Sequence, residues 1–174
     1  MSTRIIIVGG VAGGASAAAK ARRTNESADI VMFEKGPYVS FANCGLPYYV
    51  GETILNRDDL LLQTPERFWK RFRVQVQVLH EVIRIDRTAK CVQVKNLMTQ
   101  DITSHPYDTL ILAPGAGAIM PNIPGIQAKN IFTVKTVPDS DAIKTFLKNY
   151  PTQHALIIGG GFIGLETAEA LKNR

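Results

Sequence analysis

One cysteine lies in a setting where its thiol could do chemistry, in the segment VSFANCGLPYYVGE of residues 39–52. As a thiolate, Cys44 could attack a disulfide or a persulfide and so take part in redox catalysis. A free cysteine is also often packed in a core as a small apolar residue. The segment allows both interpretations, so the choice depends on the elements that must position it.

The first 34 residues predict a unit of strand, helix and strand. Arg4–Val8 is a β-branched run, Ala12–Arg23 has the alanine-rich composition of a helix, and Asp29–Phe33 is a second apolar run. A unit of about 30 residues with this order pairs its two strands in parallel. It therefore predicts the start of a Rossmann-like sheet.

The turn of this unit, GGVAGG, partly matches the dinucleotide-binding fingerprint. Gly9 and Gly14 occupy its first and third positions, whereas Val11 occupies the second, where a pyrophosphate approaches the backbone. The helix N-terminus beside Gly13 offers amide donors to phosphates. Glu34, at the end of the second strand, could accept hydrogen bonds from a ribose. The alternative is a turn that only packs, with Glu34 as a surface acid.

Residues 64–115 predict one helix followed by strands. Thr64 and Pro65 suit the cap and the first position of a helix. Tyr107–Ala113 is an apolar strand that ends at Pro114 and Gly115. Three further runs alternate apolar and polar residues, as antiparallel strands with one wet face do: Val74–Val78, Val82–Asp86 and Cys91–Lys95.

A second cycle follows the linker-like residues 121–125. Ser140–Asn149 predicts a helix, Ala155–Ile158 a strand, and Phe162–Asn173 a further helix. Between the last two lies GGGFIG, which has glycine at all three fingerprint positions: Gly159, Gly161 and Gly164. No strand completes this unit, so we expect the sequence to be a fragment of a longer protein. We therefore divide it into a domain over 1–125 and a truncated second domain over 126–174.

Two dinucleotide turns favour two redox cofactors that exchange a hydride. The residue that would distinguish NADH from NADPH would lie beyond Arg174, so this choice stays open. The turns also bear on Cys44, because a redox thiol beside two such cofactors has a source of electrons.

Composition excludes several other classes of function. Hydrophobic residues make up 45% of the chain and no apolar run approaches the roughly 20 residues of a membrane helix, so we expect a cytoplasmic protein without a membrane partner. The net charge of +5 reflects basic residues that cluster between positions 67 and 95. They could bind phosphates or form a solvated face, and no nucleic-acid motif accompanies them. The two cysteines have no metal-site spacing, so we expect no metal and two free thiols.

Five segments resemble the FAD-dependent pyridine nucleotide-disulfide oxidoreductases: GGVAGGASAAA, FEKGPYVSFANCGLPYYVGE, QTPERF, HEVIRID and YDTLILAPGA. Among these proteins they are most similar to the coenzyme A-disulfide reductase group, which includes CoA-persulfide and polysulfide reductases. The resemblance implies an α/β, Rossmann-like, three-layer FAD/NAD(P)-binding fold with an antiparallel β excursion, followed by the start of a second Rossmann-like domain. It also implies a homodimer for the full-length protein.

The resemblance also assigns cofactors to the two turns. The first turn would bind FAD and the second would bind NADPH or NADH. Pro114 stands where relatives carry threonine, which removes one hydroxyl contact. The residues implied for FAD, beyond the turn and Glu34, are Lys35, Val82 through its backbone, Ala113 and Gly115.

The resemblance implies a catalytic role for Cys44, which would form a mixed disulfide with coenzyme A as substrate or bound partner. Relatives with two redox cysteines place the second one five residues further on, where this chain has Tyr49. Cys91 is expected to be a bystander. The start of a short helix at Cys44 would favour the thiolate. The residues implied for CoA are Ser16, Lys20, Arg23, Ser40 and Asn43, with Arg71 as a candidate because Phe72 occupies the register of the family's lysine.

Two alternatives remain open. An NADH oxidase or peroxidase would cycle its single cysteine through a sulfenic acid. A truncated nucleotide-binding module would be catalytically silent. Asn43 and Pro47 beside the cysteine favour the CoA branch, whose substrates would be CoA disulfide, CoA persulfide or polysulfide.

Overall fold

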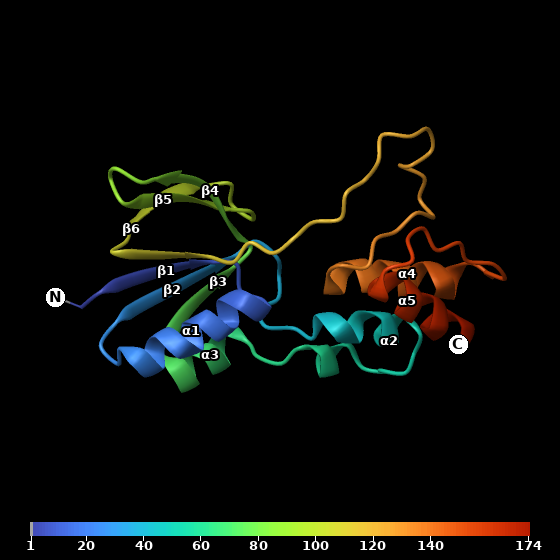
Figure 1. The fold of residues 1–174 in the computed structure, drawn as a ribbon, viewed down its shortest axis with the longest axis horizontal. Coiled ribbons are helices and arrows are strands. Elements are labelled where there is room, and N and C mark those ends of the chain that lie inside the picture. Colours follow the sequence, from blue (N-terminus) through green and yellow to red (C-terminus); the bar gives the residue numbers. More distant parts are fainter. Residues whose placement is uncertain (1) are drawn as a thin grey trace. The chain divides into compact units, whose positions relative to one another are not determined.

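The structure is a computed structural model that describes residues 2–174, and it divides into two compact units (Figure 1). The first unit contains residues up to 41 together with 61–115. The second contains residues 42–60 and 116–174.

A four-stranded parallel sheet lies in the first unit. Its strands are β1 (Arg4–Val8), β2 (Asp29–Glu34), β3 (Val74–Val78) and β7 (Thr109–Leu112), in the order β3-β2-β1-β7. The predicted strands are therefore confirmed here, and β1 and β2 pair in parallel as expected. The antiparallel prediction for β3 was wrong, because β3 pairs in parallel with β2. The alternating sequence VQVQV indicates a strand with one solvent-facing side, which fits the place of β3 at the edge of the sheet. The alternation does not indicate whether the strand pairs in parallel or antiparallel.

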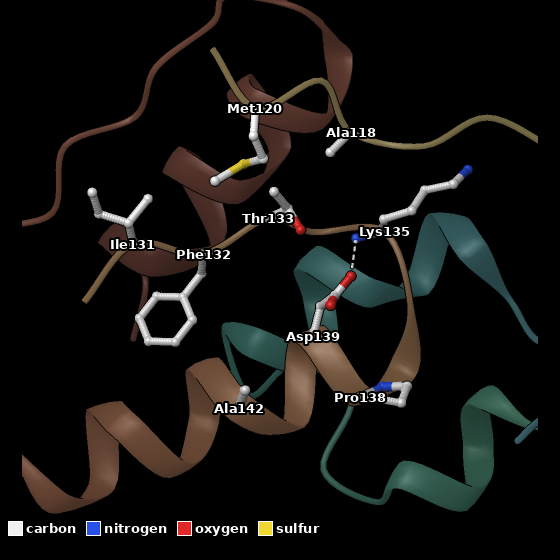
Figure 2. Close-up of a pocket in the computed structure, with 9 residues that line it drawn as sticks. All are labelled: Ala118, Met120, Ile131, Phe132, Thr133, Lys135, Pro138, Asp139 and Ala142. Carbon is white, nitrogen blue, oxygen red and sulfur yellow. Dashed lines mark hydrogen bonds between the residues drawn. The ribbon is translucent and has the colours of Figure 1, made fainter. Parts of the chain in front are cut away.

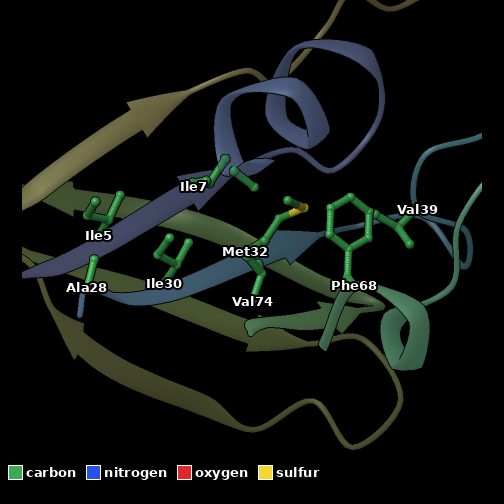
Figure 3. Close-up of a cluster of buried hydrophobic side chains, with 9 residues drawn as sticks. Ile5, Ile7, Ala28, Ile30, Met32, Val39, Phe68 and Val74 are labelled. Atoms are coloured by element: carbon green, nitrogen blue, oxygen red, sulfur yellow. The ribbon is translucent and has the colours of Figure 1, made fainter. Parts of the chain in front are cut away.

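Two helices cover one face of this sheet. They are α1 (Ala12–Thr24) and α3 (Pro65–Phe72), and α3 begins where the cap residue predicted it: the Thr64 hydroxyl accepts a hydrogen bond from the Arg67 amide. Phe68 of α3 and Ala18 of α1 pack on the sheet residues drawn in Figure 3. The cluster comprises Ile5, Ile7, Ala18, Ala28, Ile30, Met32, Val39, Phe68 and Val74.

An antiparallel sheet packs on the opposite face. Its strands are β4 (His80–Asp86), β5 (Cys91–Asn96) and β6 (Ile102–Pro106). Val92 and Val94 of β5 form a second buried cluster with Ile6, Val31 and Phe33 of the parallel sheet. Helices, parallel sheet and antiparallel sheet make the three layers of the predicted fold class. Strand β6 was not predicted, because its residues ITSHP lack an apolar alternation.

The second unit is helical. It contains the 3₁₀ turns η1 (Asn43–Gly45) and η2 (Arg57–Leu60) and the helices α2 (Leu46–Val50), α4 (Val137–Asn149) and α5 (Phe162–Lys172). Helix α4 begins three residues earlier than predicted, because Thr136 and Asp139 form a reciprocal capping box. No helix within residues 2–174 is long and apolar enough to cross a membrane.

The predicted strand Ala155–Ile158 was wrong, because these residues form no regular element. Leu156 and Ile158 are 86% and 84% exposed. A strand needs a neighbour to bond its backbone groups, and every strand that the structure describes pairs within the first unit. An apolar β-branched run is therefore not sufficient to form a strand here.

Arg22 on α1 links the ends of the two helices through hydrogen bonds to backbone oxygens. Its guanidinium donates to the backbone oxygens of Phe72 and Arg73, where α3 ends, at 2.8 and 3.0 Å. It also donates to the Asn25, Glu26 and Ala28 oxygens at the end of its own helix. One planar fork thus satisfies carbonyls from two segments, a geometry that lysine cannot reproduce.

We expect Arg22→Lys to lower the free energy of unfolding by about 1–3 kcal/mol, because several carbonyls lose a charged donor. Urea denaturation measures this. Arg23→Ala is the control, since Arg23 is exposed on the same helix. Equal stability of the two variants would contradict a bracing role for Arg22.

His105 of β6 lies between the two sheets. Its ring packs edge-on against Phe33 at 4.9 Å between centroids, and its Nε2 is 2.9 Å from the Thr103 hydroxyl. Burial lowers the pKa of His105 below its ordinary 6.5, and the positive charges of Arg4 and His80 lower it further. The folded chain therefore resists protonation more strongly than the unfolded chain.

Since the folded pKa is the lower one, stability is lost as the pH falls below about 6.5, where the unfolded chain takes up the proton first. We expect the wild type to lose more unfolding free energy between about pH 7.5 and pH 5.5 than His105→Gln. Urea midpoints at the two pH values measure the difference. His154→Gln should follow the wild type, since His154 is exposed.

Candidate dinucleotide and thiol sites

The first glycine turn is a close contact between backbone segments. Gly9 has a φ of 93°, and a Cβ built on it would lie 2.0 Å from the Ala113 oxygen. A Cβ on Gly14 would lie 1.7 Å from the Gly9 oxygen. Only glycine fits at either position, as the fingerprint predicted. The contact leaves α1 starting directly behind the end of β1.

Glu34 is held at the same edge of the sheet. Its Oε2 accepts a hydrogen bond from the Gly10 amide and its Oε1 accepts one from the Gly36 amide, both at 2.7 Å. The side chain is only 8% exposed, so the interpretation as a surface acid was wrong. A carboxylate has about four acceptor sites, and two remain for hydroxyl groups such as those of a ribose.

The second turn repeats this geometry in the second unit. Gly159 has a φ of 111°, and a Cβ on Gly164 would lie 2.2 Å from the Gly159 oxygen. The isoleucine two residues before the first glycine also lies in the same place in both turns. A Cβ on Gly164 would lie 3.3 Å from Ile157 Cγ2, and a Cβ on Gly14 would lie 3.3 Å from Ile7 Cγ2. The turn therefore forms although the preceding residues form no strand.

Both turns suit a phosphate. The helices behind them, α1 and α5, carry no acidic residue in their first turn, so their N-terminal amides and positive dipole ends face no competing carboxylate of their own. Gly159, Gly160 and Gly161 have no atom within 4 Å of their Cβ positions. The two turns differ at the N-cap residue of the helix, which is Val11 in the first turn and Gly161 in the second. The backbone in front of the second turn is therefore open to a ligand.

Cys44 lies in the middle of η1, and its side chain is exposed. The expected short helix follows as α2, with Pro47 in its first turn. The thiol is therefore not packed as a buried apolar residue. Cys91, in contrast, is half-buried on β5, with its Sγ 3.7 Å from the Val92 oxygen. Of the two cysteines, Cys44 is the one presented to solvent.

The other candidate residues divide between the two units. On α1, Ser16, Lys20 and Arg23 lie at spacings of four and three residues, which places them along one exposed stripe. Asn43 is exposed beside Cys44 in the second unit. The first unit also carries Lys35 and Arg71, which are exposed, Gly13 on α1, Val82 on β4 beside the second buried cluster, and Ala113 and Gly115 after β7.

Three features escaped the sequence analysis. Ser40 adopts a left-handed φ of 47°, and its backbone bonds the Gly10 oxygen and the Leu62 amide. The amides of Gly10 and Gly36 hold Glu34. Tyr49 bonds Asp141, which is 92 residues away. Apart from the bond between Gly36 and Glu34, these contacts join residues that are distant in the sequence, so no local pattern predicts them.

A separate pocket of about 500 Å³ lies in the second unit at the start of α4 (Figure 2). Its walls are largely apolar, with Met120, Ile131 and Phe132 among them. Its carboxylate, Asp139, accepts hydrogen bonds from the amides of Lys135 and Thr136 and is part of the helix cap. None of the predicted site residues lines it.

Two glycine turns of the same construction, each leading into a helix, define a protein of the Rossmann-like dinucleotide-binding class. The family model for pyridine nucleotide-disulphide oxidoreductases matches residues 3–174. The chain belongs to this family.

Among curated relatives, the chain is 43% identical over 171 residues to coenzyme A disulfide reductase of Staphylococcus epidermidis. The match covers 98% of this chain and 38% of the relative. The chain thus spans well under half the length of that protein.

Three solved structures are similar. Reduced CoADR-RHD of Bacillus anthracis has a TM-score of 0.97 at 50% identity, over 99% of this chain and 31% of that one. A NAD-dependent persulfide reductase from A. fulgidus has a TM-score of 0.94 at 35% identity, over 98% and 32%. A water-forming NADH oxidase from Lactobacillus brevis, bound to NADH, has a TM-score of 0.92 at 29% identity, over 99% and 38%.

The first turn yields a sharp test. We expect Gly14→Ala to lower the free energy of unfolding by more than about 2 kcal/mol, because its Cβ would overlap the Gly9 oxygen. Gly13→Ala is the matched control on the same helix, since its Cβ would make only an ordinary contact with Ala113, at 3.5 Å. It should be neutral or stabilising by up to about 1 kcal/mol. Thermal unfolding compares the two, and equal losses would refute the close-contact argument.

Proposed function

We propose that the protein to which this chain belongs is an NAD(P)H- and FAD-dependent reductase of CoA disulfide, CoA persulfide or polysulfide. The observation that carries the proposal is the exposed thiol of Cys44 in the turn η1, directly before the short helix α2, in a chain with two glycine turns. The similarity to a coenzyme A disulfide reductase and to a persulfide reductase supports the choice of substrate class.

In this proposal Cys44 acts as a nucleophile. Its thiolate attacks one sulfur of CoA disulfide, so that a bond forms between Cys44 and the first CoA while the second CoA leaves as a thiolate. Two electrons and a proton then cleave the mixed disulfide. This releases the first CoA as a thiol and returns Cys44 to the thiolate. A persulfide or polysulfide would react in the same way, with a shorter sulfur compound as the leaving group.

The cofactors would be held by the two turns. Gly9, Gly14 and Glu34 would bind the ADP half of FAD, together with Lys35, Val82, Ala113 and Gly115. Gly159, Gly161 and Gly164 would bind NADH or NADPH. When bound, the two cofactors supply the electron pair that the mixed disulfide consumes. The buried Glu34 carboxylate, already fixed by two amides, would orient a ribose without moving.

The phosphates of coenzyme A would bind basic side chains. Lys20 and Arg23 lie on one exposed stripe of α1 with Ser16, so a nucleotide lying along this helix could contact all three. Ser40 and Asn43 would contact the end of CoA that carries the thiol, and Arg71 would be a further cation.

The remaining parts of the proposal concern the whole protein. We propose an FAD-binding portion over residues 1–125 that includes the cysteine segment, and a linker helix with the beginning of an NAD(P)H-binding portion over 126–174. We further propose a cytoplasmic homodimer with small-molecule substrates and no nucleic-acid partner.

A second candidate function is an NADH oxidase or peroxidase, favoured by the similarity to the water-forming NADH oxidase. The two candidates differ in the oxidised form of Cys44. A reductase of CoA disulfide carries a CoA adduct on this residue, whereas an oxidase or peroxidase carries a sulfenic acid. A catalytically silent nucleotide-binding module would form neither.

We expect treatment with CoA disulfide to add the mass of one CoA moiety to the chain, with the adduct on Cys44 in the peptide map. Cys44→Ser should remove the adduct and the matched control Cys91→Ser should keep it, because only Cys44 is exposed. Intact-mass spectrometry reads the result. A sulfenic acid after peroxide treatment, without any CoA adduct, would decide for the oxidase or peroxidase.

A further inference from the structure

The helix that follows Cys44 is too short to hold its own orientation. Helix α2 has five residues, and the turn η1 before it has three. Isolated helices shorter than about 12–15 residues are marginal in water, so α2 depends on what it packs against. Its buried residues are Leu46, Pro47, Tyr49 and Val50. The direction in which Cys44 presents its sulfur therefore depends on how α2 is docked.

Tyr49 makes the polar part of this docking. Its hydroxyl donates to Asp141 Oδ1 of α4 at 3.0 Å, although the ring is only 7% exposed. Lys144, one turn further along α4, donates from its Nζ to the Tyr49 backbone oxygen at 3.1 Å. The same ammonium lies 4.3 Å from the centre of the Tyr49 ring. Two side chains on successive turns of α4 thus hold both the ring and the carbonyl of one residue.

Other contacts fix the two ends of the segment. The Ala42 amide donates to the Leu60 oxygen at 2.8 Å before the turn. After α2, Gly51 lies against α5 so closely that a Cβ on it would be 2.6 Å from the Ala170 oxygen. Arg57 of η2 adds an ion pair with Asp141, with 3.8 Å between its Nη1 and Asp141 Oδ2. The Tyr49 cluster, defined as Tyr49, Asp141 and Lys144, is the specific part of this arrangement.

We propose that the Tyr49 cluster is a positioning device that orients the Cys44 turn for disulfide exchange. The inference rests on the proposed function, in which Cys44 attacks a disulfide. Exchange requires the thiolate to approach along the S–S bond, so it depends on the direction of the sulfur and not only on its exposure. Tyr49 occupies the fifth position after Cys44, and its side chain is directed at α4. It thus serves to set the direction of the lone thiol.

The test compares two reactions of Cys44 in a Cys91→Ser background. Exchange with CoA disulfide, and with the uncharged 2,2′-dithiodipyridine, depends on orientation. Alkylation by iodoacetamide is far less demanding in geometry. We expect Tyr49→Phe and Lys144→Met to slow both exchange reactions about 3- to 10-fold, the equivalent of one hydrogen bond, with little change in alkylation.

Matched variants separate positioning from general stability. Lys148→Met removes an exposed lysine from the same helix and should leave all three rates unchanged. Asp141→Asn keeps an oxygen that can accept a hydrogen bond from the Tyr49 hydroxyl. Its rate of disulfide exchange at Cys44 should therefore be higher than that of Asp141→Ala. Rates are measured at a temperature well below the unfolding midpoint of each variant. In the double variant Tyr49→Phe/Lys144→Met, the loss of exchange rate should differ from the product of the two single losses, because both residues belong to one cluster.

The outcomes are distinct. Exchange rates that fall in step with alkylation, or that do not change in Tyr49→Phe and Lys144→Met, overturn the positioning inference. A wild-type chain that reacts with dithiodipyridine but not with CoA disulfide overturns the proposed substrate class. The dithiodipyridine series then still decides whether the Tyr49 cluster orients Cys44.

Discussion

The contact between the Gly14 Cα and the Gly9 carbonyl is the constraint on which the first unit depends. It lets α1 start directly behind β1, so that Ala18 reaches the sheet and the amide ends of the helix lie at the edge where β2 ends. Glu34 completes this edge by bonding the Gly10 amide from one side and the Gly36 amide from the other. A bulkier residue at either glycine would separate the helix from the strand and disturb both the core and the edge of the sheet where Glu34 lies.

The chain uses the same constraint a second time, under different conditions. Around Gly159 and Gly164 there is no paired strand, and Leu156 and Ile158 are exposed, yet the turn adopts the same close contact. Local sequence is therefore sufficient for the glycine turn, whereas a strand needs a partner. This difference explains why one part of the second cycle was predicted correctly and another was not.

The sequence predicted an element of the fold correctly where a few neighbouring residues determine it. The cap at Thr64, the glycine turns and the short helix after Cys44 all follow from a few neighbouring residues. The patterns failed where a distant partner decides: the direction of β3, the polar strand β6 and the unpaired residues 155–158. At the candidate site they singled out Glu34 and Cys44, whose roles stay predictions, but they did not predict the left-handed Ser40 or the bond between Tyr49 and Asp141. Those features arise from tertiary contacts that leave no trace in local periodicity.

The tyrosine at position 49 also has a consequence for redox equilibrium. Because position 49, on the helix after Cys44, carries no thiol, Cys44 would form its disulfide with a second molecule and not with a neighbouring cysteine. The midpoint potential of an internal disulfide does not depend on thiol concentration, whereas that of a mixed disulfide falls by about 30 mV for each tenfold increase in the free thiol that leaves, because this thiol is a product of the reduction. The oxidation state of such a cysteine would therefore report the composition of the surrounding thiol pool by mass action, and the protein alone would have no single potential of its own.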